Sequence, residues 1–194
     1  MKRRRTEIKT NIDMKRILTF CSVLLIAATA FAQAPRYGLE SGSYKMETNV
    51  MGQTVTSTIY FDDFGAKEAT SVSMMGVDMT QILKDGKVYV VDKAQRSVQE
   101  MPQQQSINYM DLTEEVIAKN KIQEIGTETV AGKECTVYTL EMSQMGQTAK
   151  ATVCIWQGFA MKTTINTSGI TITTKIVEIN EGPVDASIFE IPGF

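Results

Sequence analysis

The residue types that could do chemistry are few, and two cysteines, Cys135 and Cys154, are the most suggestive of them. The chain of 194 residues contains no histidine, which removes the commonest general base and the commonest metal ligand. Without histidine, its serines have no partner for the usual hydrolase triad. The cysteines also lack the Cys-x-x-Cys spacing of a redox pair. We therefore expect a structural disulfide between them, with two buried free thiols as the alternative.

Methionine is the second unusual residue type. Twelve are present, and Met74, Met75 and Met79 cluster around Gly76. Thioethers can hold Cu(I), but methionine also fills irregular cores and lines adaptable apolar cavities. Because no histidine or cysteine stands near the cluster in the sequence, we expect the core or cavity role and no metal site.

The acidic residues that could form an acid–base pair or a calcium site fall in expected turns and at an expected helix start. They are Asp62, Asp63, Asp78, Asp85, Glu114 and Glu115. Solvation and capping already explain carboxylates at such places, and the spacing of a calcium loop is missing. The sequence thus predicts a protein that is not an enzyme and that uses no cofactor.

The N-terminal region predicts export. From Met14 the chain has a basic start, an apolar stretch over residues 17–30 and then Ala30-Phe31-Ala32, which is typical of a secretory signal peptide cleaved after Ala32. Met14 opens a complete signal peptide, so we interpret residues 1–13 as an upstream extension. The apolar run is shorter than the roughly 20 residues of a membrane-spanning helix, and no later run approaches that length.

The remaining residues, 33–194, have the length of a single domain. They carry 13 basic and 20 acidic side chains, a net charge of −7, without any basic run. This balance argues against binding of nucleic acid and against electrostatic attachment to an anionic membrane. Together with the signal peptide, it predicts an exported protein that is soluble or peripheral to the membrane.

Alternation of polar and apolar residues predicts β-strands over most of this domain. From Gly42 to Met101 the alternation is interrupted by turn signals every eight to twelve residues, and it resumes from Ile122 to Ile179. Between the two halves, residues 108–120 have helical spacing, and Asp111 or Thr113 can cap the helix. We predict about ten strands in a strongly curved antiparallel meander or incomplete barrel, with one main helix between its two halves.

The word Met-Gly-Gln-Thr occurs at Met51 and again at Met145, inside a longer repeat. If both words are hairpin turns, Tyr44 must share a face with Ile59, because a slip of one residue would turn an apolar row to solvent. The equivalent register in the second hairpin brings Cys135 near Cys154, on the face opposite the apolar row.

Three segments carry a resemblance to a known family. They are residues 131–138 (AGKECTVY), residues 153–158 (VCIWQG) and residues 182–192 (GPVDASIFEIP). With the signal peptide, they resemble exported envelope proteins of Bacteroidetes-type bacteria that are grouped with the LolA/LolB-like lipoprotein-sorting superfamily and neighbouring domains of unknown function. The resemblance covers most of residues 38–194. It implies a location in the periplasm or at the outer-membrane periphery of a Gram-negative bacterium. It implies a helix over an apolar concave face, which in the carriers of that superfamily receives lipid acyl chains.

From this resemblance we expect a noncatalytic protein that binds an apolar or acylated ligand, a lipid or lipoprotein acyl chain, in a cleft between the curved sheet and the helix. The residues expected to line the cleft have inward-facing apolar side chains: Met46, Ile59, Phe61, Met74, Met110, Leu112, Leu140, Val153 and Ile155. The chain has fewer predicted helices than those carriers use as a lid, and no partner-docking residue can be matched. The alternative is a structural or sensory envelope protein with a filled core that acts through protein–protein contacts.

Overall fold

The structure is a computed structural model that describes residues 35–194, apart from residues 51, 75–76, 103–105, 145–146 and 168. The expected signal peptide, residues 1–32, and the expected start at Met14 therefore lie outside the described residues. So do the side chains of some residues beside the internal gaps, that of Met74 among them. Across the described ranges, no helix has the length and apolarity needed to cross a membrane.

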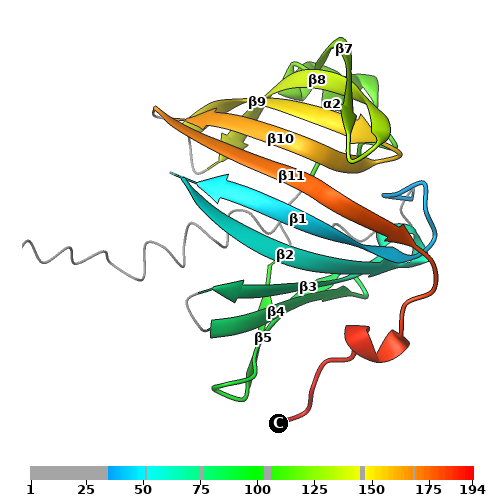
Figure 1. The fold of residues 1–194 in the computed structure, drawn as a ribbon, viewed down its shortest axis with the longest axis vertical. Helices are drawn as coiled ribbons and strands as arrows, with labels where there is room; N and C mark the ends of the chain where they lie inside the picture. The colour runs from blue at the N-terminus through cyan, green and yellow to red at the C-terminus, as the bar shows by residue number, and fades with distance from the viewer. Residues whose placement is uncertain (1–34, 51, 75–76, 103–105, 145–146, 168) are drawn as a thin grey trace, which may run out of the picture.

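The described chain forms one antiparallel sheet of eleven strands. The strands are β1 (Gly42–Val50), β2 (Gln53–Asp62), β3 (Lys67–Met74), β4 (Val77–Lys84), β5 (Lys87–Asp92), β6 (Ser97–Met101), β7 (Gln123–Val130), β8 (Lys133–Gln144), β9 (Gln147–Trp156), β10 (Phe159–Thr167) and β11 (Ile170–Glu181). Their order across the sheet is β6-β5-β4-β3-β2-β1-β11-β10-β9-β8-β7, so β6 and β7 are the two edges (Figure 1). The predicted curved meander is confirmed, and the sheet does not close into a barrel.

The connection from β6 towards the opposite edge shows how strongly the sheet curves. Met101 ends β6, and Ile107 already packs on an apolar cluster formed by β8 and β9. β6 and β9 are eight positions apart in the sheet, which is about 38 Å in a flat sheet. The chain from Met101 to Ile107 can reach only about 21 Å. The sheet must therefore curl until its edges approach each other, which gives the incomplete barrel of Figure 1.

The α-helix of the described residues, α2 (Glu114–Asn120), packs on the face of the sheet that carries Leu140 and Val153, and we call this face the inner face. Of the two predicted caps, Thr113 is the one used, and its Oγ1 accepts a hydrogen bond from the backbone N of Val116 at 3.3 Å. The helix is shorter than predicted because Asn108 Oδ1 accepts from the N of Met110 and turns the preceding backbone. Val116 and the segment before α2 pack on Leu140, Ala151, Val153 and Ile155 of β8 and β9.

The C-terminal tail covers the outer face near the other edge. The 3₁₀ turn η2 (Ala186–Phe189) buries Phe189 against Ala69, Ile82 and Val91. Glu68 faces inward together with its cross-strand partner Phe61. The next residue of the strand, Ala69, therefore faces outward, and so does the cluster that Phe189 joins. The helix and the tail therefore lie on opposite faces of the sheet.

The two Met-Gly-Gln-Thr words stand at equivalent hairpins. Val50 pairs with Gln53 in the first hairpin and Gln144 with Gln147 in the second, although residues 51, 145 and 146 are outside the described residues. Tyr44 lies opposite Ile59, so the predicted register of the first hairpin is confirmed.

Cys135 and Cys154 are buried on the same face of the β8–β9 pair, but both are free thiols. The predicted disulfide is not formed, because the register sets Val137 opposite Cys154 and leaves Cys135 one diagonal step away. The Cys135 thiol instead donates to the carbonyl of Lys133, with a sulfur–oxygen distance of 3.3 Å. The structure thus has the alternative arrangement of two buried thiols.

Candidate functional site

The inner face carries an apolar row that crosses five strands. Direct cross-strand pairs place its members side by side from β1 to β8, in the order Val50, Ile172, Ile165, Ala151 and Leu140. The three members Ile172, Ala151 and Leu140 are buried, whereas Val50 and Ile165 are half-buried. Paired side chains on one face touch, so the row is a continuous apolar strip across the curve of the sheet.

A second row lies two residues farther along each strand, and hydroxyl groups occupy its centre. Its members are Val55, Thr48, Thr174, Thr163, Val153 and Tyr138. Thr48 is 5% exposed and Thr174 is 9% exposed. Their Oγ1 atoms are 3.3 Å apart and share a hydrogen bond. The inner face is therefore uncharged along both rows, with a small polar centre.

Directly behind the apolar strip, the outer face is polar. The row behind the apolar strip consists of Thr54, Asn49, Thr173, Thr164, Thr152, Thr139 and Gln123. Alternate residues of a strand face opposite sides, so one register produces both the apolar inner strip and the polar outer one. This contrast marks the inner face as the side that can receive an apolar group.

The structure divides the residues expected to line a cleft among different environments. Leu140, Val153 and Ile155 are buried in the cluster beside α2, where Leu112 packs on them. Ile59 is also buried and faces inward, opposite Tyr44 and Thr70.

The other expected lining residues lie away from that cluster. Phe61 is fully buried at one end of the sheet, in an aromatic cluster with Tyr37 and Phe159. Met46 is half-buried on the inner face, and Met110 is 46% exposed. The side chain of Met74 lies outside the described residues. The expected set therefore does not lie together as one lining.

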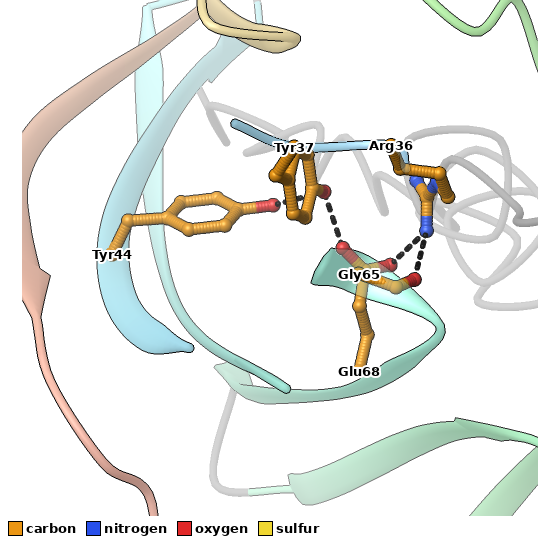
Figure 2. A network of polar contacts seen from close by, with 5 residues as sticks. All are labelled: Arg36, Tyr37, Tyr44, Gly65 and Glu68. Atoms are coloured by element: carbon orange, nitrogen blue, oxygen red, sulfur yellow. Dashed lines mark hydrogen bonds and ion pairs between the residues drawn. The ribbon is translucent and has the colours of Figure 1, made fainter. Parts of the chain in front are cut away.

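A buried polar network closes the end of the sheet near Phe61, and Figure 2 shows its members. The guanidinium of Arg36 lies 2.9 Å from Oε2 of Glu68 and also donates to the carbonyl of Gly65 at 3.2 Å. The two charged side chains are only 16% and 11% exposed. The other carboxylate oxygen of Glu68 accepts from the hydroxyl of Tyr37, which lies 3.5 Å from the hydroxyl of Tyr44. Both carboxylate oxygens of Glu68 are thus occupied.

The protonation states in this network follow from burial and charge. Burial raises the pKa of Tyr37 well above its usual value, and the Glu68 carboxylate raises it further. Burial likewise raises the pKa of Tyr44. Burial alone lowers the pKa of Arg36, but the attraction of Glu68 outweighs it, so the net pKa is raised. The network therefore holds one ion pair and two phenols that stay neutral near neutral pH.

The network anchors the segment that precedes β1. The backbone N atoms of Arg36 and Tyr37 donate to the carbonyl of Phe64, and the N of Gly38 donates to the carbonyl of Gln157 at 2.9 Å. The ring of Tyr37 stacks on Phe159 with centroids 4.0 Å apart. The segment thus ties the corner between β2 and β3 to the turn between β9 and β10, and its role is to hold the two halves of the sheet together.

Sequence reasoning missed this network. The one available signal was Glu68, which occupies an inward position in the alternation of β3 and must therefore find a partner. Arg36 and Tyr37 precede the first strand and belong to no periodic pattern, so their inward position follows only from tertiary contacts. Within the described ranges, no three His, Cys, Asp or Glu side chains gather as metal ligands would.

No protein-family model matches the sequence, and a search of curated proteins finds no match. Among solved structures, an uncharacterized conserved protein from Thermus thermophilus is similar, with a TM-score of 0.57 and 8% identity over 79% of this chain and 86% of that chain. A chain of the MucA/MucB complex of Pseudomonas aeruginosa is similar with a TM-score of 0.52 and 16% identity, over 75% of this chain and 53% of that chain. The protein thus spans about half the length of that chain.

An outer membrane lipoprotein-sorting protein domain from Vibrio parahaemolyticus also matches, over 79% of this chain and 91% of that chain. Its TM-score of 0.40 and identity of 11% are too low to support an inference. At these identities the likenesses show the fold alone, a curved antiparallel sheet similar to that of MucB.

Proposed function

We propose that the protein is a noncatalytic envelope protein that binds an apolar or acylated ligand, a lipid or lipoprotein acyl chain, against the inner face of its sheet. The observation that carries the proposal is the apolar row of Val50, Ile172, Ile165, Ala151 and Leu140. Two of its members remain half-buried, so apolar surface is left for a ligand to cover.

The dimensions of the row suit an acyl chain. The three strands of the row that lie beside the helix cluster, β1, β11 and β10, span about 10 Å at their usual spacing. Each methylene group that leaves water contributes about 0.8 kcal/mol, so the part of an acyl chain that lies across these strands would gain affinity with each methylene that they cover. The polar outer face offers no comparable gain.

The position of this site differs from the expected cleft between sheet and helix. Beside α2, Leu112 and Val116 already pack on Leu140 and Val153, so these side chains bury one another's apolar surface. The proposed ligand instead lies next to the helix, over β1, β11 and β10. The fold likeness to MucB and the signal peptide expected from the sequence support the envelope location.

Two neighbouring residues of β1 give a matched test. Val50 faces inward and Asn49 outward, so Val50→Glu places a charge in the apolar row while Asn49→Glu places it among the outer threonines. Binding is measured with a neutral fluorescent fatty acyl ester, and circular dichroism verifies the fold of each variant.

We expect the unmodified protein and the Asn49→Glu variant to bind the ester, and the Val50→Glu variant to bind it at least about tenfold more weakly. Native mass spectrometry of the mildly purified protein should also show copurifying lipid. If the ester does not bind the unmodified protein and no lipid copurifies, the proposal is wrong. The packed cluster under α2 would then favour the structural or sensory role through protein contacts.

A further inference from the structure

We propose that the inner face selects an acyl chain joined through an uncharged carbonyl, such as an ester, over the ionised free fatty acid. This inference rests on the proposed function and adds the chemical class of the ligand. It follows from three buried hydroxyls at the centre of the inner face and from the distribution of charge around them.

The three hydroxyls belong to Thr48, Thr174 and Ser57. Thr48 lies opposite Thr174, and Ser57 lies opposite Met46, two residues along β1 from Thr48. They are 5%, 9% and 8% exposed, in the order named. All three are therefore at least nine-tenths buried and point to the same side as the apolar row.

These hydroxyls have hydrogen-bonding capacity that the protein itself does not use. Within the part of the chain that the structure describes, their one hydrogen bond joins Thr48 Oγ1 and Thr174 Oγ1 at 3.3 Å. That bond uses one of the two protons on the threonine pair, so one proton remains, and Ser57 adds another. A buried donor without a partner is costly, so the inner face is ready to donate to an acceptor on a ligand.

The charges near these hydroxyls face away from them. Glu47 and Lys175 are direct partners on the outer face, and Lys162 pairs with Lys175 there. Lys162 in turn binds Glu128 at 2.6 Å. Among the described residues, Arg36 is a cation that faces inward, and Glu68 neutralises it.

A fatty acid carboxylate on the inner face would therefore be buried without a counter-charge, which is strongly unfavourable. An ester or amide carbonyl accepts from the same hydroxyls without carrying a charge. The acyl chain can continue over Val50, Ile172 and Ile165, which lie two residues away along their strands. The same face thus provides donors for the carbonyl and an apolar strip for the chain.

The test compares three ligands of equal chain length by displacement of the neutral fluorescent ester: methyl laurate, laurate at a pH where it is ionised, and dodecane. The variants are Thr48→Val and Thr174→Val, singly and together, because valine keeps the shape of threonine and removes the hydroxyl. Thr173→Val on the outer face is the matched control.

We expect the unmodified protein to bind methyl laurate at least about tenfold more tightly than laurate. The double variant should lose about threefold to tenfold in affinity for methyl laurate, the value of a neutral hydrogen bond, and should bind dodecane as before. Thr173→Val should change neither affinity.

Two results would overturn the inference while leaving the proposed function intact: laurate binding as tightly as methyl laurate, or the double variant keeping full affinity for the ester. Failure of all three ligands to bind the unmodified protein would overturn the proposed function and this inference together.

Discussion

Replacing Arg36 by methionine should destabilise the fold by removing one half of a buried ion pair. Methionine keeps most of the apolar stem of arginine, so the change isolates the guanidinium. Glu68 would keep the hydroxyl of Tyr37 as a donor but would lose its counter-charge in a site where its side chain is 11% exposed. Leaving a buried carboxylate unpaired costs about 3 to 5 kcal/mol. We expect the lower end, about 3 kcal/mol, because the pair is not fully enclosed.

The double variant Arg36→Met, Glu68→Met should recover much of this loss, because it leaves no charge buried. Well-packed apolar residues in place of a buried pair are often neutral, so we expect the double variant to lie within about 1 kcal/mol of the unmodified protein. The exposed pair of Lys87 and Glu100, each side chain 55% exposed, is the matched control. Lys87→Met should have a much smaller effect on stability, because this pair is exposed to solvent.

Equilibrium unfolding in urea measures these free energies directly, and thermal unfolding gives an independent reading. For a domain of this size, 3 kcal/mol corresponds to a fall in Tm of about 6 to 12 °C. The reasoning is refuted if Arg36→Met costs no more than Lys87→Met, or if the double variant is less stable than the single one. Either result would mean that the network does not hold the segment before β1 in place.

Three further predictions concern the core. Phe189→Ala should lower the free energy of unfolding by about 3 to 5 kcal/mol, because the buried ring anchors the C-terminal tail on the outer face. An unchanged midpoint of urea unfolding would show that the tail is not docked on the sheet. Gly158→Ala should cost at least about 2 kcal/mol, because its φ is +81° and an added Cβ would lie 2.1 Å from the backbone oxygen of Arg36. The control Gly132→Ala has a φ of +75° but open space around the added Cβ, so it should cost about 1 kcal/mol. Equal losses of stability in urea unfolding would contradict this prediction. Burial raises the pKa of Cys154 to about 12 and also raises the pKa of Cys135 above the ordinary thiol value of 9.0. The contribution of the two neutral thiols to stability is therefore complete below pH 9.0 and is lost as the pH rises from 9.0 towards 12. Urea unfolding at increasing pH should show this decline, with a smaller decline in Cys154→Ala, and equal declines in the two proteins would show that the thiol is not its cause.

The two-faced character of the sheet could be predicted from the sequence because it depends on local alternation. The strand periodicity, the turn at Gly52 and the pairing of Tyr44 with Ile59 follow from period-two alternation and hairpin geometry, and the structure has all of them. The cap at Thr113 was one of two predicted choices, and the chemistry of a hydroxyl before two glutamates explains why it works. These features need no knowledge of distant contacts.

The tertiary structure decided which inward residues share a site. Phe61 and Leu140 both follow the inward alternation, yet Phe61 ends in the aromatic cluster and Leu140 beside α2, because strand order and curvature separate them. The disulfide prediction was wrong for a related reason. The pattern brings Cys135 and Cys154 to the same face, but a disulfide depends on the register to within one residue, and the register set Val137 opposite Cys154.

The sequence by itself determined an antiparallel meander with one mainly apolar face, because alternation within each strand is a local property that does not depend on how the whole chain folds. Only the tertiary structure brought Arg36 to Glu68 and set Thr48 beside Thr174, because these pairs are 32 and 126 residues apart in the chain. No periodic pattern links such positions. Thr48 meets Thr174 because β1 pairs with β11 in the middle of the sheet, and Arg36 meets Glu68 because the segment before β1 crosses the end of the fold.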